Sequence, residues 1–352
     1  MKKITALLLA LCMVFALAAC GSSSSTSSAP AATEAPAPAE AAPVEAAPAE
    51  ASEPGPKEGG TSLTFTTGGP AGTYYAFGGV IAQQVSDLTS TKITAITSGG
   101  SAANIDALDV GDAQLGFSQS DVLSYAYAGS RTFEEIGAVT DFSIVAPLYM
   151  EQVQIVTLNP EIKTVADLAG KSVSIGAAGS GVYFNAIDVL GAYGLTEDDI
   201  KPTYQSFDDS TEALQDGQID AAFIVAGAPT NAVTALSASN DVYLVSLDDI
   251  HIDDLIATSP YYSRYEIPAE TYGMAEDATT VAVGAVVIAA NSVSDVDVYN
   301  FLTGVFDNLD ALAKLHDKAN ELSLEYASSF AGVPYHPGAV QYFADKGIDV
   351  AG

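Results

Sequence analysis

Short alternating or β-branched runs recur along the chain after about residue 60, separated by longer and largely apolar segments. The short runs are typical of strands and the longer segments of helices. Strands are predicted over residues 63–66, 93–97, 115–118, 143–149, 153–158, 172–175, 221–225, 242–245 and 280–289. Helices are predicted over residues 73–88, 101–110, 165–168, 182–193, 210–215, 230–238, 296–314 and 337–346. This alternation predicts an α/β fold with a mainly parallel sheet.

A glycine-rich turn, Thr67-Gly68-Gly69-Pro70-Ala71-Gly72, joins the first predicted strand to the first predicted helix. Its glycines let the backbone turn sharply and approach a ligand closely. Thr73 is placed to cap the helix, whose N–H groups would face an anion or a carbonyl oxygen. Because the Gly-Lys-Ser/Thr ending of a phosphate loop is missing, the turn favours a small-molecule site over a nucleotide site.

Two segments recur about 106–109 positions apart. Gly72-Thr73-Tyr74-Tyr75 is echoed by Gly181-Val182-Tyr183-Phe184, and Leu108-x-x-Gly111 is echoed by Leu214-x-x-Gly217. The order is the same in both copies, which indicates two lobes of similar plan, and a single repeat spacing excludes a solenoid.

Five polar or glycine-rich loops each follow a predicted strand. In open α/β sheets such strand ends form the ligand cleft. The loops are 68–74, 98–101 with Asn104, 119–121, 178–181 and 226–230.

The N-terminal residues have the pattern of an exported lipoprotein. Two lysines, an apolar run and small residues over 1–19 predict a signal peptide, and Leu17-Ala18-Ala19-Cys20-Gly21 resembles the lipoprotein box, with Cys20 as the lipidated residue. The alternative, a membrane-spanning anchor, is disfavoured because the run is shorter than ~20 residues. Residues 20–60 are Ser, Ala, Pro and Glu-rich and are predicted to be a disordered tether.

Charge and chemistry exclude several classes of function. The whole chain has a formal charge of −32, which disfavours nucleic acid and anionic lipid as partners. The three histidines lie outside the five loops, and no zinc, EF-hand or nucleophile-elbow motif is present. The sequence predicts no enzyme, no metal site and no cofactor.

Taken in order, the motifs resemble the TAXI family, the TRAP-associated extracytoplasmic solute-binding proteins. The resemblance rests on these segments: Gly68-Gly69, Gly72-Thr73-Tyr74-Tyr75, 98–104, Gln119-Ser120-Asp121, Ile175-Gly176, Gly179-Ser180-Gly181, 220–223, 227–230 and 281–285. It implies a type II periplasmic-binding-protein fold, in which two α/β lobes joined by a hinge close on a solute in a ligand cleft. It also implies transfer of the solute to an ion-driven permease, and relatives are associated with glutamate, glutamine and small carboxylates. Val182 departs from the family, which usually has threonine there.

The candidate ligand-binding residues come from these loops: Gly68, Gly72, Thr73, Tyr74, Ser98, Ser101, Asn104, Gln119, Ser120, Asp121, Ser180, Gly181, Tyr183, Gly227 and Pro229.

Several candidates also have a purely structural interpretation. Thr73, Ser101 and Ser180 are equally placed for helix capping, and Asn104 for a local hydrogen bond. Asp121 is a candidate for binding an ammonium group or for capping its helix, whereas Tyr183 is expected to pack in the core.

The five loops contain no Arg or Lys. Helix N-termini and hydroxyl groups would then bind the carboxylate of a solute, which favours a monocarboxylate or an amino acid over a dianion.

The sequence therefore predicts a lipid-anchored extracytoplasmic solute receptor of a TRAP-type importer, with partners that are a small solute, a membrane permease and the membrane through Cys20. Lobe 1 is assigned to residues 61–150 plus 286–352 and lobe 2 to residues 151–285. The alternatives are a receptor for an ATP-driven importer, a sensor, or an enzyme on the same fold.

Overall fold

The computed structural model describes residues 55–352. The predicted signal peptide, Cys20 and most of the predicted tether lie outside the described residues. The end of the predicted tether is tied to the folded part: Asn300 Oδ1 accepts a hydrogen bond from the backbone N–H of Lys57 (2.6 Å), and Ser90 Oγ accepts one from that of Gly60 (2.9 Å). The folded part therefore begins no later than Lys57.

Ten strands of the described residues form one sheet, in the order β2-β1-β3-β10-β4-β7-β5-β6, with β8 beside β4 and β9 beside β10. The strands are β1 (Ser62–Thr66), β2 (Lys92–Ile96), β3 (Leu115–Gln119), β4 (Phe142–Thr157), β5 (Ser172–Ser174), β6 (Lys201–Thr203), β7 (Ala221–Ala226), β8 (Tyr243–Leu244), β9 (Ser263–Ile267) and β10 (Ala278–Ala290).

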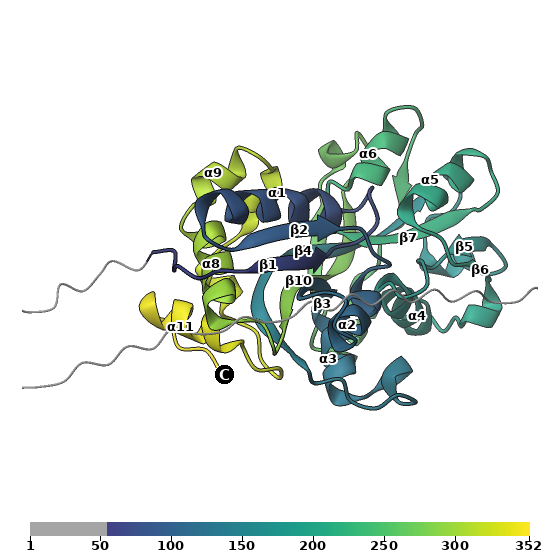
Figure 1. Ribbon diagram of the computed structural model, residues 1–352. Helices are drawn as coiled ribbons and strands as arrows, with labels where there is room; N and C mark the ends of the chain where they lie inside the picture. The colour runs from purple at the N-terminus through teal and green to yellow at the C-terminus, as the bar shows by residue number, and fades with distance from the viewer. Residues whose placement is uncertain (1–54) are drawn as a thin grey trace, which may run out of the picture. The chain divides into compact units, whose positions relative to one another are not determined.

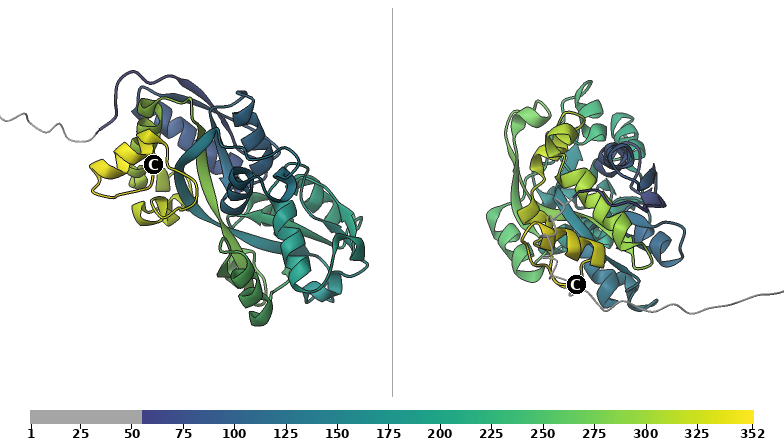
Figure 2. Two further views of the ribbon diagram at one scale, coloured as in Figure 1. Left: turned by 90° about the horizontal axis from the view of Figure 1, so that it is seen from below. Right: turned by 60° about the vertical axis from the view of Figure 1, so that its left-hand side comes forward.

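The prediction of a mainly parallel sheet is wrong, because the sheet is mixed. Parallel pairs join β1, β2 and β3 at one end and β5, β6 and β7 at the other. Between them run β4 and β10, which are antiparallel to each other and to β7 and β3, respectively. Figure 2 shows these two long strands side by side in its left view.

The helices cover the two ends of this sheet (Figure 1). They are α1 (Thr73–Leu88), α2 (Ser101–Asp109), α3 (Ser120–Ala128), α4 (Val182–Ala192), α5 (Phe207–Gln215), α6 (Asn231–Ser237), α7 (Asp249–Thr258), α8 (Asp295–Phe306), α9 (Leu309–Ala313), α10 (Leu324–Ala327) and α11 (Pro337–Asp345). Single 3₁₀ turns are η1 (Arg131–Phe133), η2 (Val165–Leu168), η3 (Glu197–Asp199), η4 (Ala269–Thr271) and η5 (Asp317–Glu321).

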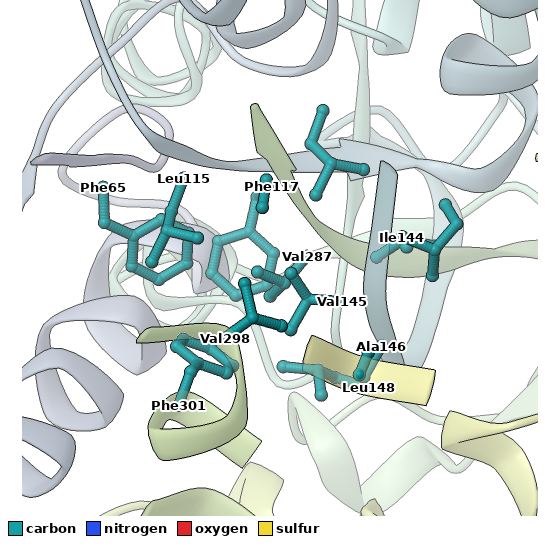
Figure 3. Close-up of a cluster of buried hydrophobic side chains, with 14 of the residues drawn as sticks. Phe65, Leu115, Phe117, Ile144, Val145, Ala146, Leu148, Val287, Val298 and Phe301 are labelled. Atoms are coloured by element: carbon teal, nitrogen blue, oxygen red, sulfur yellow. The ribbon is translucent and has the colours of Figure 1, made fainter. Parts of the chain in front are cut away.

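We call the part containing β1–β3, α1–α3 and α8–α11 the first half, and the part containing β5–β8 and α4–α7 the second half. A large buried hydrophobic cluster fills the first half, and Figure 3 shows part of it, with Phe65, Phe117 and Phe301 among the labelled side chains. Two smaller clusters fill the second half. Phe184 of α4 is an exception, since it packs in the cluster of the first half.

Each sequence echo corresponds to a repeated local structure. Helices α1 and α4 begin directly after Gly72 and Gly181. Gly111 and Gly217 both have positive φ (+82° and +65°), and each donates its N–H to the carbonyl of the leucine three residues earlier (3.1 Å in both). Glycine is favoured in this left-handed conformation. The two halves therefore repeat the same helix start and the same helix end.

Four predicted elements differ from the structure in type or in number. Residues 143–149 and 153–158 are parts of one strand, β4, which continues through Glu151 and Gln152. The helix predicted over 296–314 is two helices, α8 and α9, because Asn308 interrupts it in a non-helical conformation (ψ 30°). The helix predicted over 165–168 is the 3₁₀ turn η2.

Candidate ligand site

A cavity of about 90 Å³ lies where the loops of the two halves meet. It is lined by Gly68, Gly69, Gly72, Thr73, Tyr74, Ser98, Gly99, Gly100, Ser101 and Gln119, by Glu151 of β4, and by Ala177, Ser180, Gly181, Val182, Gln205, Ser206, Phe207, Val225 and Ala226. A water needs roughly 10–15 Å³ of such space, so there is room for about six to nine non-hydrogen atoms. The cavity suits a small solute.

Four helices begin at this cavity without a side-chain cap. Their N-cap residues are Gly72 for α1, Gly100 for α2, Gln119 for α3 and Gly181 for α4. Uncapped N-termini leave backbone N–H groups available and carry partial positive charge, which favours a negatively charged group nearby.

The predicted capping roles of Thr73 and Ser101 are wrong, because each lies one residue inside its helix. The Thr73 hydroxyl instead donates to the carbonyl of Gly227 across the halves (2.8 Å). Ser101 Oγ accepts the N–H of Gln119 (3.1 Å) and so joins α2 to the end of β3.

Two polar side chains of the cavity lack protein partners. Gln119 is 2% exposed, and its Oε1 accepts no hydrogen bond from the described residues. Ser180 Oγ is buried and is also without a partner in this part of the chain. Buried polar atoms are normally paired, so these two are candidates for contact with a bound molecule.

Glu151 is a lining residue that the sequence analysis did not identify. It is 2% exposed, and its Oε2 accepts a hydrogen bond from the Tyr74 hydroxyl (2.6 Å). Burial raises the pKa of its carboxyl to about 8, although the Tyr74 hydrogen bond and the charge of Lys318 act in the opposite direction. One feature of the sequence could have identified Glu151: it is a carboxylate between two apolar runs, 143–149 and 153–158, that were predicted to be separate strands.

The cavity contains no positive side chain among the described residues that line it. Lys318 of η5 lies nearby and is 4% exposed, but its ammonium group donates to Glu321 Oε1 (2.6 Å) and to the carbonyl of Ala228 (2.8 Å). Lys318 could not be identified from local sequence pattern, because it is almost a hundred residues from the loop that it contacts.

Three predicted site residues are buried but do not line the cavity. The Asn104 amide donates to the carbonyls of Thr67 and Phe117 (2.7 Å each) and so joins the ends of β1 and β3. Ser120 Oγ accepts the N–H of Gly284 on β10 (2.9 Å). Asp121 accepts a hydrogen bond from Asn185 of α4 (3.0 Å), and burial raises its pKa to about 7.

The three other predicted residues outside the lining lie in the second half. Tyr183 is half-buried, and its hydroxyl donates to Glu197 (3.1 Å). Gly227 packs against Lys318, and a Cβ there would lie 2.8 Å from the Lys318 Cε. Pro229 is exposed and borders a second cavity beside Lys318.

A polar link joins the halves away from the cavity. Arg131 of η1 forms an ion pair with Asp188 of α4 (2.6 Å), and its guanidinium lies over the rings of Tyr125 and Phe184. The backbone of Arg131 is in the left-handed region (φ 59°), which is uncommon for a residue with a side chain.

Within residues 55–352, no helix is long and apolar enough to cross a membrane. The same residues contain no group of three or more His, Cys, Asp or Glu side chains arranged to hold a metal ion.

Comparison with known proteins identifies relatives of this chain. The model of the NMT1-like family matches residues 65–347. A protein of Escherichia coli (strain K12) named as an aliphatic sulfonates-binding protein is 32% identical over 117 residues, which span 33% of this chain and 34% of that protein. The match thus covers about a third of the length of that relative.

Solved structures share the fold. A structure described as a periplasmic transporter is similar with a TM-score of 0.51 and 14% identity, over 82% of this chain and 93% of the other. The periplasmic aliphatic sulphonate binding protein SsuA from Escherichia coli has a TM-score of 0.44 and 18% identity, over 80% and 89% of the two chains. The similarity to the structure described as a periplasmic transporter, together with the match to the NMT1-like family model, confirms the predicted α/β fold class of periplasmic-binding-protein type.

The resemblance to the TAXI family stays a prediction, since the family model that matches has another description. The match covers most of the described residues and includes every loop around the cavity. The chain belongs to the NMT1-like family.

Proposed function

We propose that this protein is an extracytoplasmic receptor that binds a small solute for a membrane importer. The observation that carries the proposal is the buried cavity at which four uncapped helix N-termini meet, with the Gln119 amide oxygen and the Ser180 hydroxyl left without partners. Such a site is built to bind rather than to react, because nothing in its lining resembles a nucleophile activated by a base.

Binding would act by closure of two lobes, with residues 61–150 plus 286–352 as lobe 1 and residues 151–285 as lobe 2. The separate hydrophobic clusters of the two halves support this division. Direct contacts across the cavity support a closed form, since the Ala103 N–H donates to the Gly179 carbonyl (3.0 Å) and the Ala232 N–H to the Ala71 carbonyl (3.2 Å). A solute that contacts both lobes would shift the equilibrium toward closure.

The proposed solute is a small carboxylate or an amino acid. Helix N-termini and hydroxyls would hold the carboxylate, as they do in other anion sites. A dianion is disfavoured because no Lys or Arg is among the described residues that line the cavity.

A thermal-shift screen of the purified protein against amino acids and small organic acids tests the proposal. A solute at a hundred times its dissociation constant should stabilise the protein by about 2.7 kcal/mol. The proposal fails if no compound raises the unfolding temperature and mass spectrometry of the denatured protein finds no solute that co-purified.

The proposed partner is an ion-driven permease of the TRAP type, which rests on the resemblance of the loop motifs to the TAXI family. An ATP-driven importer is the alternative. Measuring uptake of the identified solute by whole cells distinguishes the TRAP-type permease from the ATP-driven importer. Collapse of the ion gradient at constant ATP should stop uptake by a TRAP-type system and spare an ATP-driven one.

We further propose that the receptor is held at the outer face of the membrane by a lipid on Cys20. A Cys20→Ser variant should then be recovered in the soluble extracytoplasmic fraction, whereas the parent protein should sediment with membranes. Equal sedimentation of both would contradict the anchor.

A further inference from the structure

We propose that Glu151 is the ammonium-binding group of the cavity, so that the solute is a small zwitterion such as an amino acid and not a carboxylate or sulfonate that lacks an amine. This inference rests on the proposed receptor function and narrows its solute class.

The position of Glu151 supports this role. It lies at the middle of β4, opposite Val283 of β10, where the two long strands pass beneath the cavity. Among the described residues, it provides the only carboxyl group of the lining. Its Oε2 accepts from the Tyr74 hydroxyl, whereas its Oε1 accepts no hydrogen bond from this part of the chain. One carboxyl oxygen is therefore left for a bound molecule.

Glu151 forms no ion pair with a cation among the described residues. The nearest cation, Lys318, is held by Glu321 and by the carbonyl of Ala228, and it makes no hydrogen bond to Glu151. An unpaired buried carboxylate is strongly unfavourable, so the free site keeps a proton on Glu151. A solute ammonium group would provide the charge that this position lacks and would replace that proton.

The lining of the cavity combines positive potential with hydrogen-bond acceptors. The uncapped N-termini of α1, α2 and α4 provide positive potential, whereas Glu151, Gln119 Oε1 and Ser180 Oγ provide acceptors. A molecule with a carboxylate at one end and N–H donors at the other satisfies both sets. A carboxylate without an amine could pair with protonated Glu151 but would leave Gln119 Oε1 without a donor, which costs affinity.

The titratable and charged groups that face Glu151 come from several elements. They are Tyr74 of α1, Asp121 of α3, Tyr149 of β4, Lys318 of η5 and Tyr326 of α10. The tyrosines have pKa values raised above their usual value by burial, so they stay neutral near pH 7. Glu151 has a pKa of about 8 in the free protein, so exchange of its proton for an ammonium group near pH 7 should release up to about one proton.

Isothermal titration calorimetry of the purified protein tests the inference. The probes are the twenty standard amino acids, the matched acids without the α-amino group (propionate for alanine, glutarate for glutamate) and ethanesulfonate. At least one amino acid should bind a hundredfold more tightly than its matched acid. Titrations at pH 7 in buffers of different ionisation enthalpy should show proton release.

Two variants complete the test. Glu151→Gln keeps the size of the side chain and should abolish both the preference for the amino acid and the proton release, with the matched acid bound as before. Glu212→Gln removes an exposed carboxylate of α5 and should behave like the parent protein. Thermal unfolding of both variants checks that they fold.

The possible results separate the two proposals. If the matched acids bind as tightly as the amino acids, or if Glu151→Gln keeps the full preference, the ammonium-binding role is overturned while the receptor function stands. If no amino acid, acid or sulfonate binds and mass spectrometry of the denatured protein finds no solute that co-purified, both proposals fail.

Discussion

At the residue scale, two buried carboxyl groups make the stability of the free protein depend on pH. The pKa values of Glu151 and Asp121 are raised by burial to about 8 and about 7, from ordinary values of 4.5 and 3.8. The unfolded chain therefore loses these protons at lower pH than the folded protein does. The stabilising contribution is complete below the unfolded pKa and is lost as the pH rises through the folded pKa.

We therefore expect the free energy of unfolding of the solute-free protein to fall between pH 5 and pH 8. One such group contributes a slope of up to about 1.4 kcal/mol per pH unit. Urea unfolding at a series of pH values measures it. Glu151→Gln should reduce the slope of the free energy of unfolding against pH by the contribution of one carboxyl group. Equal slopes for variant and parent would contradict the raised pKa of Glu151.

At the scale of single elements, the start of α4 requires a glycine because of its neighbour in the other half. A Cβ at Gly181 would overlap with Gln119 Oε1 and lie 3.0 Å from Ser101 Oγ. The backbone itself would accept alanine, since its φ is −75°. The restriction therefore comes from contact between the halves.

Gly181→Ala should weaken solute binding at least tenfold, because the added methyl displaces the Gln119 amide and keeps the halves apart. Calorimetry with the best-binding compound of the screen measures the loss. Gly191→Ala, on the same helix with nothing within 4 Å of the added Cβ, is the matched control. It should bind normally and gain about 0.5–1 kcal/mol of stability. Equal binding by both variants would contradict the predicted contact.

The elements were predictable where local signals agree with the fold. The glycine turn and the apolar pattern predicted α1 with its observed bounds, and the echoed glycines predicted the repeated helix ends. A helix after Asp121 was expected but no bounds were predicted for α3, because Ser120 follows the last residue of β3 without any turn signal. The short strands β6 and β9 were missed because their exposed or half-buried residues give no apolar alternation.

The site was predictable only in its loops. Strand β4 was predicted as two strands because Glu151 and Gln152 interrupt its apolar pattern, and Glu151 is the residue that lines the cavity. Asn104 and Asp121 were placed in the right region, but sequence could not show that their side chains are used by neighbouring protein groups. A hydrogen bond between residues far apart in the chain, such as that from Lys318 to the carbonyl of Ala228, cannot be predicted from a local sequence pattern.

At the scale of the whole folded part, the ion pair of Arg131 with Asp188 holds the two halves together at a distance from the cavity. The side chains are 34% and 17% exposed, so solvent and salt weaken the pair. The left-handed backbone of Arg131 costs about 1–3 kcal/mol, which the contacts of its side chain must offset. The pair should therefore favour the closed arrangement only modestly.

Arg131→Gln should weaken solute binding about two- to fivefold without changing which solutes bind, because only the cost of closure changes. The difference from the parent should shrink in 0.5 M salt. Arg264→Gln is the control, since Arg264 pairs with Asp249 and Asp253 inside the second half. A loss of equal size in the control would mean that the link between the halves is not the cause.

Strands β4 and β10 are the two long segments shared by the halves, and their pairing is irregular between Ala285 and Val286 and again between Val287 and Ile288. In mechanical terms, two paired strands that are held at both ends bend easily about one axis and resist twisting and sliding. The ladder irregularities mark where such a flexure is softest. Bending there would move Glu151 and the Gly181 loop together, relative to the loops that begin α1 and α2, so opening, solute entry and re-formation of the site become one coordinate.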